Sequence, residues 1–483
     1  MTFRWNGKTP REILRISSLS EFFDWMPQSL TDGLSLFALA SFCLFPLPVA
    51  VRALFHKTFD FIVIHSMEIL DYFVFPLVIA AAFLMYVLTL GKLCHEKRSP
   101  LKEFEKHPAF LLFLFLLAWM SVGMACVHGA THEVAYGLGL NHETFLRQIE
   151  YFAGFFALGV TLQNKHWKRW FLRGVTVVSV ILVPCSFYLW QYTHASLIYP
   201  DWEPWFSCVW TNPNYYGYFL TVFISLSAGG LAGAESRGWR AFYAAALVAN
   251  SVTLCYNDTL GAWIGTLCGC LFPVLAYRLR DGRWNRRTLA ALGLFLLSMY
   301  AAGVVNGNLS PNILKLFKDI ILILTQPNAE ATKHAGSGRW FIWLRCMELI
   351  RQYPLFGIGF EGIMAKDLLS FAGNARPHNE YMQYALFYGI PAAILYTLGC
   401  ASIYVRAWRR RAVLDNVTLA ALTAAFGYLC GAFFGLTVYN TAPYLFIMLG
   451  LGYVRETAQA AETTESVETA QAAETTETVE NTD

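Results

Sequence analysis

Apolar residues in this chain gather into runs that are long enough to cross a lipid bilayer. Hydrophobic residues make up 56% of the 483 positions and charged residues 14%, against about 25% charged in an average soluble domain. A bilayer core of about 30 Å needs roughly 20 apolar residues per helix. The runs lie near residues 33–54, 72–91, 109–128, 147–163, 171–193, 215–233, 240–256, 259–277, 288–306, 383–405, 416–436 and 440–454. The sequence therefore predicts an all-helical (all-α) integral membrane protein with about 12 transmembrane helices.

Lysine and arginine are concentrated in every second connection between these runs. Basic residues close to spans stay on the cytoplasmic side of a membrane. With the N-terminus inside, the short outer loops contain only Arg52, Lys57 and Arg147. The long segment 307–382 then lies outside, and its basic residues do not contradict this because long loops cross regardless of charge. We expect a multi-pass protein of the cytoplasmic membrane, with cytoplasmic N- and C-termini and one large extracytoplasmic loop.

The end of the chain differs in composition from the rest. Residues 456–483 repeat a pattern rich in Glu, Thr and Ala that contains no aromatic residue. Such a segment cannot bury enough apolar surface to offset its ordering entropy. We therefore divide the chain into a polytopic membrane domain, 1–455, and a disordered acidic repeat tail, 456–483. The tail is either a solvated segment of low complexity or a docking segment for a partner.

Two helices are predicted inside the segment 307–382. Residues 312–324 place apolar and basic side chains on opposite sides, which suits a helix lying in the membrane interface. A second helix is predicted from Arg339 to about Gln352. Its apolar side contains Trp340, Trp343, Met347 and Ile350. We expect that side to pack against the bundle or the membrane surface.

Arg339 projects from the apolar side of this second helix, in its first turn. A cation there lies beside the positive end of the helix dipole, which is unfavourable. The position indicates a bound anion or a carboxylate partner. The alternative is an interfacial arginine that reaches lipid headgroups.

Four short motifs follow one another in and after this loop. Their order resembles the region shared by the O-antigen ligase and O-antigen polymerase family. The residues that carry the resemblance are Gly338, Arg339 and Trp343; Pro354 to Gly359; His378, Asn379 and Tyr381; and Gly389 to Pro391. Asn212-Pro213-Asn214, before the sixth run, also resembles a family feature, although a turn with a helix N-cap explains it equally.

Members of that family transfer a glycan from an undecaprenyl-diphosphate donor to an acceptor hydroxyl, outside the cytoplasmic membrane and without a metal or other cofactor. The resemblance therefore implies a metal-independent membrane glycosyltransferase of cell-envelope polysaccharide assembly. Its partners would be the lipid-linked donor, a hydroxyl-bearing lipid, glycan or protein acceptor, and membrane lipids, with no nucleic acid. Ligation and chain polymerisation use the same donor chemistry, so the sequence does not separate them.

The residue types in the motifs fit this chemistry. The guanidinium groups of Arg339 and Arg376 can hold a diphosphate leaving group bidentately. A neutral imidazole, that of His378, can accept the proton of the attacking hydroxyl. Asn214, Asn379, Tyr381 and Arg147 are further candidates for substrate binding. The alternative is that Pro377-His378-Asn379 turns the chain into the next span, with Asn379 as the helix cap.

One position departs from the family pattern. Members commonly have a basic residue near the outer end of a middle span, and Leu260 occupies the corresponding place here. Arg376, Arg147 or a lysine of the loop replaces it, or the donor differs, or the chain no longer catalyses transfer. Arg147 is three residues before Glu150 on one helix face, so the two side chains can instead pair with each other.

A transporter or flippase of lipid-linked glycans is the rival from another class. Transporters place ionisable or unwound segments at mid-membrane between repeated halves. In this sequence the middles of the runs are almost free of charge, and no repeat of one half in the other is visible. A non-catalytic scaffold that keeps the fold is the third alternative.

Overall fold

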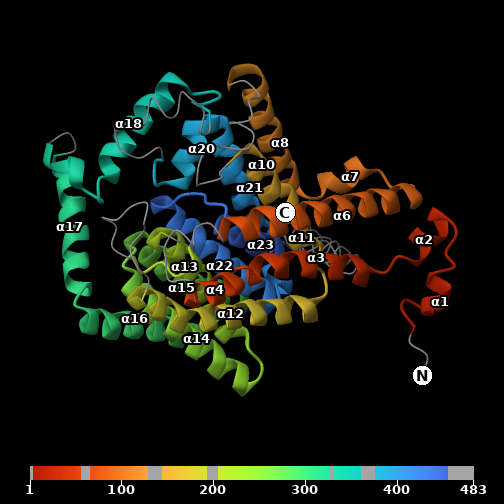
Figure 1. The fold of residues 1–483 in the computed structure, drawn as a ribbon, viewed down its shortest axis with the longest axis horizontal. Helices are drawn as coiled ribbons and strands as arrows, with labels where there is room; N and C mark the ends of the chain where they lie inside the picture. Colours follow the sequence, from red (N-terminus) through yellow and green to blue (C-terminus); the bar gives the residue numbers. More distant parts are fainter. Residues whose placement is uncertain are drawn as a thin grey trace, which may run out of the picture.

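Apolar helices make up almost all of the regular structure (Figure 1). The computed structural model describes residues 4–55, 66–128, 144–192, 205–210, 212–326, 330–359 and 376–454. The segment 456–483, expected to be a disordered tail, lies outside the described residues. Within the described residues nine helices are long and apolar enough to cross a membrane, so the prediction of an all-helical membrane protein is confirmed.

The chain begins with two short helices, α1 (Pro10–Ile13) and α2 (Leu19–Trp25), and then enters the apolar bundle. The first half of the bundle contains α3 (Gln28–Leu44), α4 (Pro46–Phe55), η1 (Leu70–Val74), α6 (Phe75–His95), α7 (Pro100–Glu105), α8 (Pro108–Gly123), η2 (Met124–His128), α10 (Phe145–Ile149), η3 (Glu150–Phe156), α11 (Ala157–Thr161) and α12 (Lys165–Tyr192). The second half contains α13 (Pro213–Gly233), α14 (Arg237–Asn257), α15 (Leu260–Asp281), α16 (Arg286–Asn306), α17 (Leu309–Thr325), η4 (Glu330–His334), α18 (Arg339–Gln352), α20 (Glu380–Tyr388), α21 (Ile390–Arg409), η6 (Arg411–Val413), α22 (Asn416–Gly431), η7 (Ala432–Phe434) and α23 (Ala442–Leu451).

The predicted runs and the observed helices coincide along the described parts of the chain. The nine long apolar helices are Gln28–Phe55, Ser66–His95, Pro108–Val127, Lys165–Tyr192, Pro213–Gly233, Leu260–Asp281, Arg286–Asn306, Ile390–Arg409 and Asn416–Phe434. The other three runs are also helical: they correspond to the succession α10, η3 and α11, to α14, and to the short helix α23. The total of twelve spans stays a prediction.

Helix α13 lies at the centre of the second half of the bundle. In its most apolar stretch, 94% of the residues are buried, the highest share among the nine long helices. It packs against α14, α15 and α22. Helices α15 and α22 approach closely because small residues face each other: a Cβ at Gly265 would lie 2.7 Å from the Cα of Gly431. Small residues at such crossings let helix backbones pack tightly in membranes.

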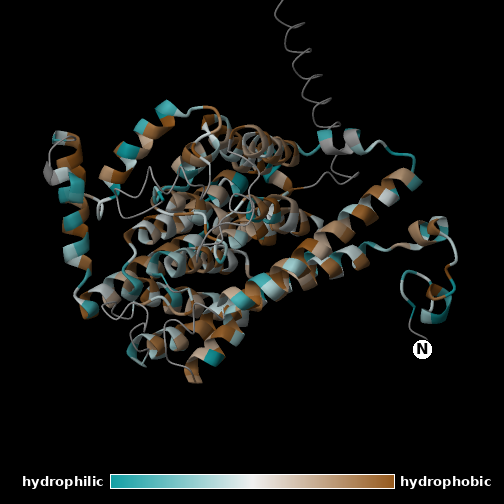
Figure 2. Ribbon diagram, turned by 45° about the horizontal axis from the view of Figure 1, so that its top comes forward, coloured by the Kyte–Doolittle hydropathy of each residue, from teal (hydrophilic) through white to brown (hydrophobic). Residues whose placement is uncertain are grey.

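Helix α17 lies at the margin of the molecule, where the chain turns sharply after α16 (Figure 1). None of its residues is buried. Figure 2 shows apolar and polar bands along α17, whereas the central helices are mostly apolar. The amphipathic helix expected at 312–324 is confirmed, with bounds three residues earlier and one residue later.

Candidate functional site

Helix α18 begins at Arg339 and ends at Gln352, as the sequence predicts. A tight turn precedes it, in which Gly336, Ser337 and Gly338 have φ values of 60°, 59° and 83°. This left-handed stretch reverses the chain and leaves Arg339 as the first helical residue. The turn is fixed at a second point because the amide of Gly336 donates to the Asp319 carboxylate of α17, over 2.9 Å.

The buried face of α18 differs from the expected one. We expected Trp340, Trp343, Met347 and Ile350 to form the packing side, but these side chains are only half-buried. The buried side chains are those of Ile342, Cys346 and Leu349, and they pack against Ile358, Leu386 and Phe387. The buried side chains of α18 therefore pack against a compact cluster formed by the next motif and α20, and on the expected side Ile350 packs against this cluster and Trp343 contacts Phe434 of η7.

The segment Pro354–Gly359 is bound to the C-terminal end of α20. The amides of Ile358 and Gly359 donate to the carbonyls of Leu386 and Phe387, over 2.8 and 3.1 Å. These bonds satisfy carbonyls that the last turn of a helix leaves without intrahelical partners. Gly357 has a φ of 68°, and a Cβ there would lie 2.4 Å from the carbonyl oxygen of Leu386. Only glycine fits that position. The motif therefore has a structural role: it packs against the C-terminal end of α20.

Trp119 of α8 completes this support. Its indole N–H donates to the carbonyls of Leu355 and Tyr388, over 3.2 and 3.1 Å, and its ring stacks on Phe356 with centroids 4.6 Å apart. Gly389 lies next to this contact, where a Cβ would be 1.8 Å from the carbonyl oxygen of Leu355. The two glycine-containing family motifs therefore pack directly on each other.

The segment Arg376–Asn379 joins α18 to α20. The indole N–H of Trp343 donates to the carbonyl of Pro377 over 2.7 Å. His378 has a φ of 49°, and Asn379 caps α20 by accepting from the amide of Met382 over 3.0 Å. The capping role considered for Asn379 is therefore confirmed. The hydroxyl of Tyr381 donates to the carbonyl of Leu429 in α22 over 2.8 Å, so it has a structural partner as well.

Arg339 and Arg376 both lie within electrostatic reach of His378, and these three residues together are called the recess below. Burial, followed by the charges of Arg339 and Arg376, lowers the pKa of His378 from its ordinary 6.5 to about 4. The imidazole is therefore neutral at pH 7. Arg376 is 4% exposed. Arg339 donates to the Oδ1 atom of Asn214 in the first turn of α13, over 3.3 Å, and no carboxylate among the described residues forms an ion pair with it.

Glu380 forms a buried acidic centre directly behind His378. Its side chain is fully buried, and the hydroxyl of Tyr396 donates to Oε1 over 2.5 Å. Burial raises the pKa of Glu380 to about 7, although hydrogen bonds with Tyr396, Tyr428 and Thr437 act in the opposite direction. Sequence reasoning missed this residue. The available signal was a carboxylate directly after His378-Asn379 and before a helix rich in tyrosine.

Tyr218 of α13 connects this acidic centre with the cationic recess. Its hydroxyl is buried and lies within electrostatic reach of both Arg339 and Glu380. Gly435, just after η7, makes room for it: a Cβ there would be 2.2 Å from the phenol oxygen.

Arg147 belongs to a different network of charges. It donates to Glu150 over 2.6 Å and to Asp71, and its guanidinium lies 3.9 Å from the centroid of the Phe75 ring. The pairing with Glu150 that the sequence left open is confirmed. Arg147 is thus largely neutralised by two carboxylates, which makes it a weaker candidate for holding a diphosphate than Arg339.

Leu260 occupies the place where family members commonly have a basic residue. Its surroundings indicate which basic side chain of this protein lies near that place. Leu260 is the first residue of α15, and Asp258 precedes it with a φ of 62°. Asp258 accepts from Asn308 over 3.0 Å and from Asn312. Burial raises the pKa of Asp258, and the charge of Lys315 on α17 acts against that rise. Lys315 is therefore a loop lysine whose charge acts on Asp258, two residues before Leu260.

Comparison with known protein families finds a match within the second half of the bundle. No curated protein matches the chain. Residues 245–397 match the family described as O-antigen ligase. This range runs from α14 into α21 and includes α17, α18, α20 and the motifs from Gly338 to Pro391. The match confirms the resemblance of the motifs: residues 245–397 of this membrane protein are similar to the O-antigen ligase family.

Proposed function

We propose that the protein is a glycosyltransferase of the O-antigen ligase type. It transfers a glycan from an undecaprenyl-diphosphate donor to an acceptor hydroxyl during assembly of cell-envelope polysaccharide. The observation that supports this proposal is the grouping of Arg339, Arg376 and neutral His378 inside the family domain. A partly buried arginine without a carboxylate partner is poised to receive an anion.

In the proposed reaction the diphosphate of the donor lies between Arg339 and Arg376. The acceptor hydroxyl attacks the anomeric carbon, and the bond from that carbon to the diphosphate oxygen breaks. The diphosphate takes the electron pair, which the two guanidinium groups stabilise. His378 accepts the proton of the hydroxyl as the new glycosidic bond forms. Asn214 and Trp343 position Arg339 and the His378 segment through the hydrogen bonds described above.

Donor binding also prepares the base in this scheme. An imidazole with a pKa of about 4 is a weak proton acceptor, because general bases work best with a pKa near the operating pH. The two arginine charges contribute to that low value. A bound diphosphate neutralises both charges and raises the pKa of His378. The base therefore gains strength when the donor is in place, which disfavours proton abstraction in the empty site.

The proposed topology places this recess outside the cytoplasmic membrane. It has twelve spans, cytoplasmic termini and an extracytoplasmic segment 307–382, within a membrane domain of residues 1–455. In this arrangement α17 lies in the outer interface with its apolar side in the lipid. Asn379 and Tyr381 complete the recess, and Lys315 supplies the basic charge in place of Leu260.

The direct test is complementation of a strain from which the gene is deleted, followed by analysis of its envelope glycan. We expect Arg339→Gln and His378→Asn to lower polymer attachment by at least about 10²-fold, as for loss of a charge-stabilising group or a general base. Arg345→Gln is the matched control, because Arg345 lies on the same helix and pairs with Glu348. Restoration of the glycan by all variants at equal membrane abundance would make the recess structural.

Polymerisation of the glycan by the same chemistry is the second candidate. The family match favours ligation and polymerisation equally. The two activities are distinguished by the product of the reaction. Purified protein supplied with a lipid-linked single repeat would lengthen the glycan if it is a polymerase. A ligase would move the repeat unchanged to the acceptor. Flippase activity predicts a different result in the deletion strain, which would accumulate lipid-linked precursor on the inner leaflet.

A further inference from the structure

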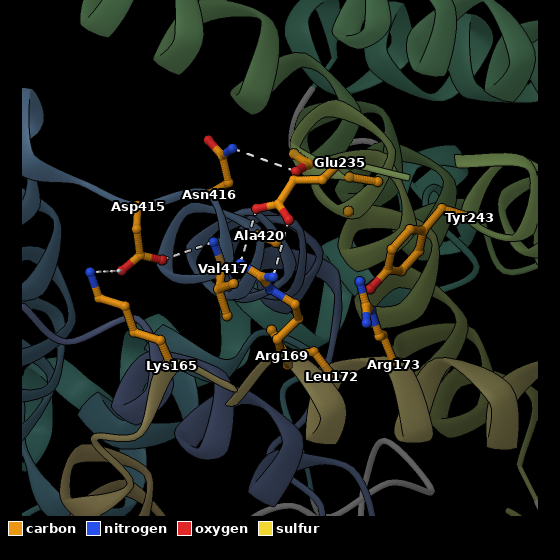
Figure 3. Close-up of a pocket in the computed structure, with 13 residues that line it drawn as sticks. Lys165, Arg169, Leu172, Arg173, Glu235, Tyr243, Asp415, Asn416, Val417 and Ala420 are labelled. Carbon is orange, nitrogen blue, oxygen red and sulfur yellow. Dashed lines mark hydrogen bonds and ion pairs between the residues drawn. The ribbon is translucent and has the colours of Figure 1, made fainter. Parts of the chain in front are cut away.

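A cavity of about 310 Å³ lies at the other end of α13 from the recess. Figure 3 shows the residues that line it. Asn214, which contacts Arg339, is in the first turn of α13, whereas Gly230 and Gly233 in the last turns line the cavity. Helix α13 has 21 residues, so its ends are about 30 Å apart at 1.5 Å per residue. The cavity is therefore on the opposite side of the membrane from the proposed active site.

Arg173 of α12 supplies a cation to the wall of this cavity. Its guanidinium lies 4.1 Å from the centroid of the Trp239 ring and 5.1 Å from that of Trp170. Figure 3 shows it beside the phenol of Tyr243. The Nε atom is buried without a hydrogen-bond partner, and no carboxylate in the described ranges pairs with Arg173. Aromatic faces hold this cation in place and leave its charge available to an anion.

The other two cations that line the cavity, Lys165 and Arg169, form ion pairs with exposed or half-buried carboxylates at its rim. Arg169 contacts both carboxylate oxygens of Glu235, over 3.3 and 3.2 Å, and Lys165 lies 3.8 Å from Asp415. Exposed pairs of this kind contribute about 0–1 kcal/mol and open readily. The Asp415 carboxylate also caps α22, where it accepts from the amides of Val417 and Thr418 over 2.9 Å. Three cations thus face two carboxylates, and among the described residues Arg173 is the cation of the three that forms no ion pair.

The interior of the cavity is apolar. Leu172, Val417 and Ala420 line it together with the aromatic ring of Tyr243. A basic rim over an apolar interior fits an amphiphile whose phosphate lies at the rim and whose chains enter the groove. The neighbouring Trp170 is half exposed, as expected of a tryptophan at the level of the headgroups.

We propose that this cavity binds the headgroup of an anionic phospholipid from the leaflet on that side of the membrane. In the proposed topology this is the cytoplasmic leaflet, where basic pockets between transmembrane helices bind anionic headgroups. A free phosphate shares the charge but would leave the apolar interior unfilled. The site is separate from the proposed active site, because none of the residues that line the cavity is among the residues assigned to glycosyl transfer.

The test is lipid binding to the purified full-length protein, measured by native mass spectrometry with phosphatidylglycerol, phosphatidylcholine or inorganic phosphate. Wild-type protein is expected to prefer phosphatidylglycerol. Arg173→Gln should weaken that binding by about five-fold, the effect of one basic residue near an anionic membrane surface, and Arg173→Lys should restore most of it. Arg283→Gln is the control, because Arg283 is exposed on the α15–α16 connection and does not line the cavity.

Four results would overturn the proposal. The first is equal binding of phosphatidylglycerol and phosphatidylcholine by wild-type protein. The second is binding of inorganic phosphate as tight as that of the lipid, which would assign the cavity to a free anion. The third is displacement of the lipid by a peptide of residues 456–483, which would assign the cavity to the acidic segment of this chain. Unchanged lipid binding by Arg173→Gln would likewise exclude Arg173 as the ligand.

Discussion

His378 lies where two arginine charges and burial act on it in the same direction. All three disfavour the imidazolium, so the side chain stays neutral well below the pH at which an ordinary histidine gains its proton. The cationic recess and the neutral base therefore depend on the same groups. Arg339 has a double effect in the proposed reaction, because it attracts the donor and keeps His378 a weak base until the donor arrives.

The pH dependence of kcat/KM tests this account, because kcat/KM reports the ionisation of the free enzyme. Only neutral His378 accepts a proton, so activity is lost as the pH falls through its pKa. We expect kcat/KM to be flat from pH 8 to about pH 5 and to fall near pH 4. Arg339→Gln should move this fall to higher pH, while Arg345→Gln should not. An acid limb near pH 6.5 in the wild type would contradict the described surroundings of His378.

Glu380 gives a second prediction, which concerns stability. Its pKa is about 7 in the fold and near 4.5 in an unfolded chain. Because the folded state binds the proton more tightly, stability is greatest below pH 4.5 and decreases up to about pH 7, by about 3 kcal/mol in total. Glu380→Gln should remove most of this dependence.

The measurement is thermal unfolding of the detergent-solubilised protein at pH 5 and pH 8. Wild-type protein should unfold at a lower temperature at pH 8, and Glu380→Gln should show a smaller difference between the two values. Glu348→Gln is the control, because that carboxylate is exposed on α18. An identical pH dependence in Glu380→Gln and wild type would show that Glu380 is not the group responsible.

At the scale of elements, the segment Pro354–Gly359 and the C-terminal end of α20 behave as one unit. We predict that Gly357→Ala destabilises the protein by about 1–3 kcal/mol or more, because the new Cβ meets a backbone carbonyl at a positive φ. Gly293→Ala on α16 is the matched control, because nothing lies within 4 Å of its Cβ position. Thermal unfolding of both variants measures the difference, and equal midpoints would contradict the tight packing at Gly357.

The bounds of α18 could be predicted from the sequence, but its buried face could not. A glycine before Arg339 and a run of good helix formers are local signals, and local signals determine where a helix begins. The choice between its two apolar sides depends on Ile358, Leu386 and Phe387, which arrive from another part of the chain. The spacing of apolar residues along α18 does not show which of its sides is covered by residues distant in the sequence.

At the scale of the whole molecule, the alternation of inner and outer connections can be tested with reporter fusions. A reporter that is active only outside the cytoplasm should be active after Ser337 and inactive after Arg410. The converse reporter, active only in the cytoplasm, should give the opposite pattern. The reversed result for both would invert the proposed topology, and it would place the cavity near Arg173 on the outer side.

Long apolar runs were sufficient to predict a helical membrane bundle, because a bilayer imposes length and composition on each helix. The candidate site was predicted only where its residues belong to family motifs. Asn214 meets Arg339 across 125 positions of the chain, and Tyr396, Tyr428 and Thr437 surround Glu380 from separate elements. Such contacts follow from helix packing, which a single sequence does not specify.

Helices α13 and α22 lie outside the range 245–397 that matches the family. Yet α13 provides Asn214 and Tyr218, and α22 provides Tyr428 beside Glu380. A fragment cut to the matching range would therefore keep every family motif from Gly338 onward and lose Asn214, which accepts from Arg339, and Tyr428, which lies beside Glu380. The range that matches the family is therefore shorter than the part of the chain that assembles the recess and its surroundings.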